Sequence, residues 1–255
     1  MQRFLLLPIA ILCLLFGLKM DARSVKVAPP HPALALLPAQ MLWAWERPED
    51  LRWLPADIGV AYVASSIQLR GEQALIRRRT APLLLTPGTA VVPVLHVDVS
   101  WHFPPTKSRQ QIDTITQELV RVAGAGNRNV VQLDFEAGRS QRAFLASTIA
   151  AVRARLDPRI ALSSTALASW CLDDYWLQES GADEVIPMVF RMGREQHALR
   201  RRIAQQHGFT QARCRAAIGF ASDEPILAVT TGRHYYFSPR PWTAASWQAV
   251  REARR

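Results

Sequence analysis

The chain has 255 residues, of which 49% are hydrophobic and 20% are charged, and this ordinary globular composition excludes a disordered protein. Its formal net charge is +10, and because only three of the 31 basic residues are lysines, 28 are arginines. The arginines are scattered, with short runs only at 77–79 and 200–202. No recognition helix, zinc-finger spacing or aromatic stacking platform accompanies them, so we predict no nucleic-acid partner.

The beginning of the chain predicts export. Arg3 supplies a positive charge, and residues 4–18 are apolar apart from one proline and one glycine. A run of about 15 residues suits the core of a signal peptide and is shorter than the roughly 20 that a membrane-spanning helix needs. Residues 1–22 are therefore expected to be a signal peptide or an N-terminal anchor. Because the cleavage site is poor, membrane association through this segment stays open. The expected location is the periplasm or the cell envelope.

A linker and one domain are expected to follow. Residues 23–39 contain four prolines and little periodicity, which predicts a linker. Residues 40–255 alternate short apolar runs with helical patterns, as a single domain would. Strands are expected at 41–46, 58–64, 91–98, 130–136, 159–165, 185–190, 216–221 and 234–238. Helices are expected at 108–123, 140–156, 194–207 and 243–254, with a shorter one at 170–179.

These elements predict an α/β fold, a single compact (β/α)8 TIM-like barrel. Strands that alternate with helices pair in parallel, and eight of them close into a barrel. Ser108 and Ser140 are suitable N-cap residues for two of the helices. Residues 67–90 look like a hairpin and residues 222–233 are too irregular for a helix, so one or two helices are expected to be replaced. An open doubly wound sheet is the alternative, but no GxGxxG sequence follows the first strand.

Side-chain alternation along two strands indicates where the chemistry lies. Apolar residues alternate with Gln132, Asp134 and Glu136 on the fourth strand, and with His96 and Asp98 on the third. Because successive side chains of a strand point to opposite faces, each polar set is expected to point into the barrel. Barrel enzymes carry their catalytic groups at the carboxyl ends of the strands. Asp134 and Glu136 are therefore the candidate catalytic residues.

Each of these residues also has a purely structural interpretation. Asp134 could accept hydrogen bonds from Ser163, Thr165 or Arg142 in a polar layer of the barrel. His96 could be a hydrogen-bonded core histidine. As metal ligands only His96 and Asp98 would share a face, so neither a metal nor another cofactor is expected.

Aromatic side chains near the strand ends favour a sugar ligand, because sugar rings stack on aromatic faces. Packing in the core is the alternative for each of these aromatic residues. The aromatic candidates are Trp43, Trp45, Trp101, Trp170, Tyr235 and Trp242. The predicted substrate-binding set is Glu46, His96, Asp98, Trp43, Trp45, Gln132, Arg142, Trp170, Arg191 and Tyr235. The two arginines follow strands and could bind acidic groups or brace the carboxylates.

Cys171 and Cys214 form an even pair outside the apolar N-terminal segment. In an oxidising compartment such a pair is a candidate disulfide. Two buried free thiols are the alternative, and the sequence alone leaves both open.

Several ordered motifs resemble an uncharacterised family of exported bacterial proteins with a domain of unknown function. They are WAWERPEDLR (43–52), QLDFEAGRSQR (132–142), ALASWC (166–171), PMVFRMG (187–193) and SDEP (222–225). The resemblance covers nearly all of residues 41–242 and implies a glycosidase-like barrel without an established activity. The strand QLDFE is also similar to the fourth strand of chitinase-type barrels, whose pattern is Asp-x-Asp-x-Glu. That similarity implies that Glu136 is the general acid and that Asp134 orients it. The chain departs from the pattern at Gln132.

Two functions therefore compete. The first is a glycoside hydrolase-like protein that acts on a cell-envelope or extracellular polysaccharide by carboxyl acid/base catalysis. Asp98, Glu46 or Glu224 could supply a further nucleophile or base, unless the substrate itself assists. The alternative is a non-catalytic barrel that binds a glycan or scaffolds an envelope complex. An oligosaccharide or polysaccharide is the expected partner in both main cases, and the oligomeric state is not indicated.

Overall fold

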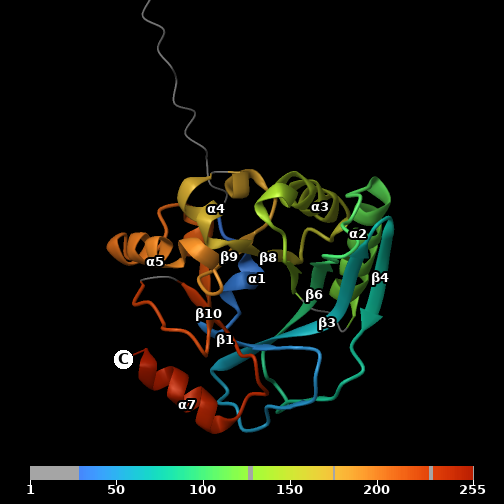
Figure 1. Ribbon diagram of the computed structural model, residues 1–255. Helices are drawn as coiled ribbons and strands as arrows, with labels where there is room; N and C mark the ends of the chain where they lie inside the picture. The colour runs from blue at the N-terminus through green and yellow to red at the C-terminus, as the bar shows by residue number, and fades with distance from the viewer. Residues whose placement is uncertain (1–28, 126–128, 175, 230–231, 255) are drawn as a thin grey trace, which may run out of the picture.

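Eight parallel strands close into a barrel in the computed structural model, which describes residues 29–125, 129–174, 176–229 and 232–254 (Figure 1). The strands are β1 (Gln40–Ala44), β3 (Ile58–Arg70), β6 (Val91–Val99), β7 (Val130–Phe135), β8 (Ala161–Leu167), β9 (Glu184–Met188), β10 (Ala217–Ala221) and β11 (Arg233–Phe237). The sheet closes because β1 pairs in parallel with β3 on one side and with β11 on the other. The predicted TIM-like barrel is confirmed.

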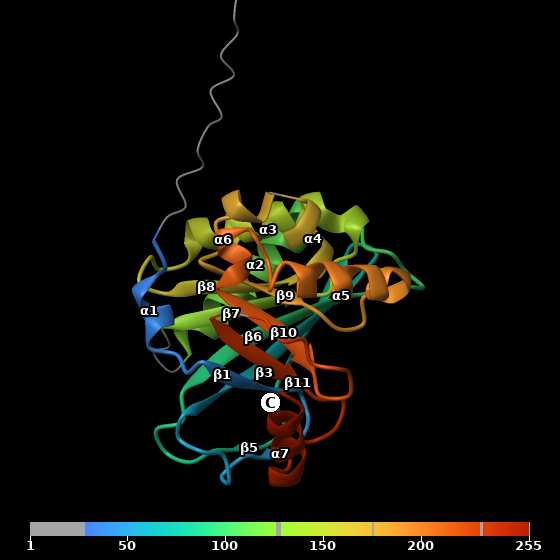
Figure 2. The ribbon, with the colours of Figure 1, turned by 90° about the vertical axis from the view of Figure 1, so that its left-hand side faces the viewer.

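Most of the helices cover one side of the barrel. They are α2 (Arg109–Gly124), α3 (Arg142–Arg155), α4 (Ala168–Asp173), α5 (Gln196–Gln205) and α6 (Ala212–Arg215). The last helix, α7 (Ala244–Ala253), lies on the opposite side (Figures 1 and 2). Short 3-10 turns η1 (Arg139–Gln141), η2 (Trp176–Glu179) and η3 (Gly193–Glu195) complete the connections.

The predicted caps meet different outcomes. Ser108 caps α2 as predicted, because its hydroxyl accepts a hydrogen bond from the backbone N–H of Gln111 at 3.3 Å. Ser140 does not cap a helix but lies inside η1. The residue before that turn is Gly138, and its backbone N–H donates to the side chain of Gln141 at 2.8 Å. This bond satisfies a donor at the start of the turn, so a serine cap is not needed there.

A hairpin replaces the helix after the second barrel strand, as predicted. Residues Ser65–Arg70 of β3 pair antiparallel with β4 (Gln73–Arg78), and Gly71 at the tip has a φ of +52°, which glycine adopts readily. Two short strands, β2 (Glu49–Asp50) and β5 (Leu83–Leu84), form a separate parallel pair. The described part of 222–233 ahead of β11 contains no helix, as predicted.

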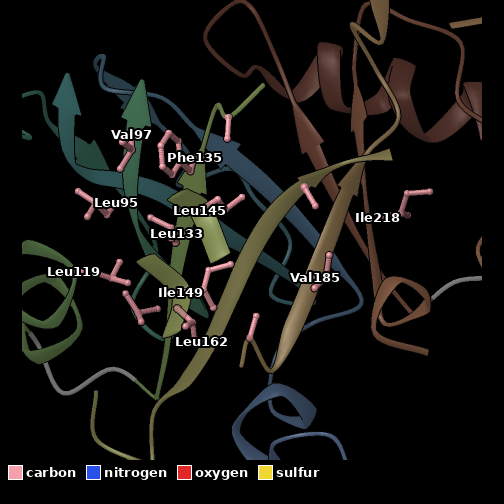
Figure 3. Packing of buried hydrophobic residues seen from close by; sticks show 14 of the residues in the cluster. Leu95, Val97, Leu119, Leu133, Phe135, Leu145, Ile149, Leu162, Val185 and Ile218 are labelled. Atoms are coloured by element: carbon pink, nitrogen blue, oxygen red, sulfur yellow. The ribbon is translucent and has the colours of Figure 1, made fainter. Parts of the chain in front are cut away.

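Alternating side chains divide the apolar core into two layers. The outward-facing residues of the strands, such as Val97, Leu133 and Val185, pack against helix residues such as Leu119 and Ile149 (Figure 3). The inward-facing residues fill the barrel itself and include Met41, Trp43, Ala61, Val63, Val92, Val94, Ile186 and Phe237. Complete burial of each large apolar side chain contributes about 1.5–3 kcal/mol, so both layers stabilise closure.

A buried polar cluster closes the amino-terminal end of the barrel. The Glu184 carboxylate, with 0% exposure, accepts hydrogen bonds from Ser163 at 2.8 Å and from Tyr235 at 3.0 Å, and it pairs with Arg233. The same arginine donates to the carbonyls of Leu34 at 2.5 Å and Pro38 at 2.9 Å. These bonds hold the segment around α1 (Pro32–Ala35) against this end. The carboxyl end of the barrel is therefore where a ligand site is expected.

The amino-terminal predictions lie largely outside the described residues, which begin at residue 29. The described part of the predicted linker, residues 29–39, contains α1, whose Ala33 and Leu34 are buried against the barrel. Within the described residues, no helix combines the length and the hydrophobicity needed to cross a membrane.

Cys171 and Cys214 form a disulfide that joins α4 to α6 across 43 residues of sequence. Both sulfur-bearing residues are fully buried in the outer core layer. The structure thus favours the first of the two alternatives that the sequence left open.

Non-reducing peptide mapping of the purified protein should yield a peptide pair linked through Cys171 and Cys214. A loop of this length restricts the unfolded chain, so the Cys171→Ser/Cys214→Ser double variant should lose up to about 4 kcal/mol of unfolding free energy. Urea denaturation of the two proteins measures this loss. Two free thiols in the mapped protein would refute the disulfide.

Candidate active site

A cavity of about 840 Å³ opens at the carboxyl end of the barrel strands. Asp134 and Glu136 line it from the end of β7, and Trp45 lines it from the end of β1. The rest of the lining comes from the segments after β8, β9 and β11 and includes Leu167, Ser169, Met188, Phe190, Arg191, Arg194 and Phe237. Strand alternation has therefore brought both candidate carboxylates to the expected end of the barrel.

Asp134 is a fixed, buried carboxylate. Its side chain is 3% exposed and accepts a hydrogen bond from the Thr165 hydroxyl at 2.7 Å. The other carboxylate oxygen lies 2.8 Å from Nδ1 of His96, on the neighbouring strand β6. Bonds to both oxygens hold the carboxylate in one orientation and compensate for its burial.

His96 carries a positive charge in this arrangement. Burial opposes the charge, but the hydrogen bond to Asp134 and the negative charges of Asp134, Glu136 and Asp98 outweigh it and raise the pKa of His96 to about 9. As an imidazolium, His96 donates Nδ1–H to Asp134, and its Nε2 lies 3.9 Å from the Glu136 carboxylate. The edge of Trp45 contacts the ring at a centroid distance of 5.4 Å. His96 thus links the two carboxylates.

Glu136 differs from Asp134 in being accessible. Its side chain is 57% exposed and lines the large cavity, two residues beyond Asp134 on the same strand face. Partial burial raises the pKa of the Glu136 carboxyl, as do the charges of Asp134 and Asp98, against the opposing charge of His96. The net direction is upward, which favours the protonated form. A carboxyl with a raised pKa that faces a cavity is suited to donate a proton.

A second cavity, of about 300 Å³, adjoins the first. Trp45 lines both cavities, and His96 lines the second while contacting the carboxylates of the first. The remaining lining comes mainly from β3, from the β4 hairpin strand and from the end of β6, and it includes Glu46, Ser66, Gln68, Leu75, Ile76, Arg77 and Asp98. The predicted residues Glu46 and Asp98 therefore lie together, but on the other side of Trp45 and His96 from the large cavity.

Four of the predicted aromatic contacts require correction. Trp43 and Tyr235 are 0% exposed inside the barrel, Trp170 is 5% exposed, and Trp242 is 3% exposed. Trp43 stacks on Phe237, and the Tyr235 hydroxyl bonds to Glu184 at the closed end. Trp170, a buried residue of α4, packs against Trp176. None of the four lines either cavity, so a sugar does not reach them; among the six candidates Trp45 and Trp101 remain accessible.

Gln132 and Arg142 also fall outside both cavities. Gln132 is 0% exposed within the barrel, and its side-chain amide has no hydrogen-bond partner in the described part of the chain. Arg142 pairs with Asp174 at 2.5 Å and lies over the ring of Trp176. The prediction that these two residues contact substrate is corrected, because one is sealed in the barrel and the other is engaged on the surface.

Arg191 lines the large cavity, as predicted, but its guanidinium also forms an ion pair with another residue. Its guanidinium pairs with Asp223 at 3.0 Å. Glu224, a candidate base, accepts a hydrogen bond from the Arg191 backbone N–H at 2.9 Å and pairs with Arg200 at 2.7 Å. Glu224 lines neither cavity and instead fixes the loop after β9, which removes it from the candidate catalytic groups.

Several cavity residues were not predicted from the sequence. Phe190 and Phe237 provide apolar walls, and Arg194 on η3 has no ion pair within the described residues. The PMVFRMG motif contained a signal for Phe190, since it directly follows a barrel strand. Across the described residues, no group of three or more potential metal ligands is found.

Comparison with known proteins supports the fold. No protein-family model matches the sequence, and no curated protein matches it. The structure is similar to the crystal structure of putative Chitinase A from Streptomyces coelicolor, with a TM-score of 0.56 and 11% sequence identity. The alignment covers 85% of this chain and 97% of that one. The chain thus shares a TIM-like barrel with that protein, and at this identity the similarity concerns the fold alone.

The charge on His96 should make stability depend on pH. Because its pKa rises from 6.5 to about 9 in the folded protein, the imidazolium stabilises the fold fully below about pH 6.5 and loses this effect as the pH rises through 9. The loss should approach about 3 kcal/mol. Urea unfolding at pH 5.5 and 9.5 of the wild type and of His96→Asn measures it, since the titrations of groups remote from His96 cancel in the comparison. An equal pH dependence in both proteins would contradict the assignment.

Proposed function

We propose that this protein is a glycoside hydrolase that cleaves an envelope or extracellular polysaccharide built from N-acetylated amino sugars. The observation that carries the proposal is the pairing of two carboxyls with different environments on β7. Asp134 is buried and fixed by two hydrogen bonds, whereas Glu136 is accessible in the cavity and has a raised pKa. Paired carboxyls whose surroundings separate their protonation are characteristic of glycosidic cleavage.

Glu136 is proposed to be the general acid. Breaking a glycosidic bond requires a proton on the leaving oxygen while positive charge develops on the sugar ring. Glu136 supplies that proton from the cavity wall, and its carboxylate then accepts a proton from the attacking water. Asp134 and His96 are positioning residues in this scheme. Burial is the main cause of the raised pKa of Glu136; the positive charge of His96 lowers this pKa, and the smaller effect of the Asp134 charge raises it.

The choice of an N-acetylated sugar follows from the carboxylates that line the large cavity. Besides Asp134 and Glu136, the described lining includes the carboxylate of Glu195, which pairs with Arg139. No further unpaired carboxylate of the described residues is therefore available in this cavity as a nucleophile. A substrate whose own acetamido oxygen attacks the sugar carbon needs only the acid and its supporting charge. The chitinase-like fold agrees with such a substrate.

A non-catalytic glycan-binding barrel is the second candidate, and Gln132 favours it. In the chitinase-type pattern an aspartate stands at this position, whereas this chain has a buried, uncharged amide that forms no hydrogen bond to Asp134. In the hydrolase proposal His96 takes over the contact to Asp134 from the adjacent strand. The two candidates therefore differ in whether the protein cleaves a glycan when His96, and not an aspartate at position 132, holds Asp134.

The cellular location and the family are proposed on separate grounds. A buried disulfide is typical of proteins that fold in an oxidising compartment, which supports the periplasm or cell envelope. Membership of the exported family of unknown function rests on the five ordered motifs in the sequence.

Replacing Glu136 with glutamine should remove the transferable proton while keeping the shape of the side chain. General acid catalysis contributes about 10²–10⁴-fold, so hydrolysis should slow by a factor in this range. The assay is reducing-end release from chitin, peptidoglycan and soluble N-acetylglucosamine oligomers. Because Glu136 is largely exposed, the unfolding free energy should stay within about 0.5 kcal/mol of the wild type.

Two comparisons make this assay decisive. Asp134→Asn should also abolish most turnover, but with a loss of stability, because the group is buried and accepts two hydrogen bonds. Glu195→Gln, on the same cavity wall, should leave turnover within a factor of three. Cleavage that survives Glu136→Gln within a factor of two would refute the assignment. Glycan binding without any cleavage by the wild type would establish the second candidate.

Residues 1–40 should direct a fused reporter out of the cytoplasm. A positively charged start followed by an apolar run of about 15 residues is the pattern of an export signal. A reporter that is active only outside the cytoplasm measures this, and replacing three leucines of the run with aspartate is the control. A reporter signal equal to that control would exclude export through this segment.

A further inference from the structure

We infer that the glycan-binding cleft extends beyond the catalytic cavity, across Trp45 into the second cavity and on to an exposed platform at Trp101. The occupant is a polymer of amino sugars. This inference rests on the proposed function and adds where the rest of the polymer lies. It predicts a protein that binds and cuts within a chain and not only at its end.

The first observation is that the catalytic groups lie where the two cavities meet. Glu136 lines the large cavity and is 3.9 Å from His96, which lines the small one. The ring of Trp45 lines both and packs edge-on against His96. A sugar bound beside Glu136 therefore has room for a neighbouring unit on either side. An enzyme that removed terminal units only would need one of these sides closed.

The second observation concerns the chemistry of the small cavity. Its hydrogen-bonding groups are the Ser66 hydroxyl, the Gln68 amide, the carboxylates of Glu46 and Asp98, and the cationic side chains of Arg77 and His96. Leu75 and Ile76, 45% and 44% exposed on β4, provide an apolar wall. A mixture of acceptors, donors and apolar surface suits a sugar, which presents hydroxyls at its edge and C–H groups on its face. Two carboxylates and two cations balance each other in this lining, which suits an uncharged sugar.

The third observation is Trp101, whose side chain is 90% exposed. It follows β6 directly, three residues after the cavity residue Asp98, and so lies at the same end of the barrel. Phe103, 52% exposed, belongs to the same connection. A large apolar ring that remains exposed at this end of the barrel, three residues after a cavity residue, is the kind of surface that stacks on sugar rings.

The backbone that carries Trp101 is held in place. Ser100 N–H donates to the carbonyl of Leu69 at 2.9 Å, and Gly71 N–H donates to that of Phe103 at 3.0 Å. The Arg70 guanidinium lies over the Phe103 ring at 4.1 Å. These contacts dock the loop on the β3–β4 hairpin, the same hairpin that forms the small cavity. The backbone on either side of Trp101 is therefore positioned before a ligand binds, which lowers the entropic cost of ordering this loop.

The test compares a polymer with a short oligomer. Dissociation constants for glycol chitin and for chitobiose are measured on the full chain carrying Glu136→Gln, which prevents turnover. Adding Trp101→Ala should lower the ratio of polymer to chitobiose affinity about tenfold, while Trp101→Phe should restore most of it. Leu36→Ala, which removes another exposed apolar side chain at the closed end of the barrel, is the matched control and should leave the ratio unchanged. Because Trp101 is exposed, its loss should not unfold the protein.

The wild-type enzyme gives a second measurement. Cleavage within the chain should lower the viscosity of glycol chitin before many reducing ends appear, and Trp101→Ala should slow this fall. If Glu136-dependent cleavage occurs but Trp101→Ala leaves the ratio of polymer to chitobiose affinity unchanged, the extended cleft is wrong and the hydrolase proposal stands. If the ratio falls but nothing is cleaved, the cleft stands and the hydrolase proposal is wrong. Failure to bind either probe overturns both.

Discussion

Closure of the sheet by β1 is the constraint on which the rest of the structure depends. Because β1 pairs with both β3 and β11, every second side chain of eight strands is forced into an interior without solvent. Apolar residues fill most of that space, and each polar group placed there needs a partner. Glu184 finds its partners at one end and Asp134 at the other. The first cluster closes its end of the barrel, and the large cavity opens at the second.

The electrostatics of the site follow from this placement. A buried carboxylate at Asp134 favours the protonated form of His96, and Glu136 is the accessible carboxyl beside the resulting ion pair. The same arrangement explains how Asp134 is held in place although Gln132 stands where the chitinase-type pattern has an aspartate. Support comes from the neighbouring strand instead of from two residues upstream.

Much of the fold and the polar part of the site could be predicted from the sequence, because both depend on strand periodicity. Alternation correctly assigned Asp134 and His96 to the barrel interior, where they meet. The aromatic contacts could not be predicted in this way. Trp43 and Trp45 point to the same side of β1, and only their height in the barrel separates a buried core ring from one that faces a cavity. The height of a residue along the barrel axis depends on the register of β1 with β3 and β11, which the sequence of β1 alone does not reveal.

The hairpin strand β4 ends the sheet and presents an edge that pairs with no other strand among the described residues. Such an edge can recruit a strand from another molecule and start aggregation. Arg77 and Arg78 place two exposed charges along it beside the exposed Leu75 and Ile76. Arg79 then ties the strand back to the barrel through the carbonyls of Trp45 and Arg47. Charged side chains on an exposed edge oppose pairing with the edge of a neighbouring copy, so Arg77 and Arg78 counter the aggregation that Leu75 and Ile76 alone would favour.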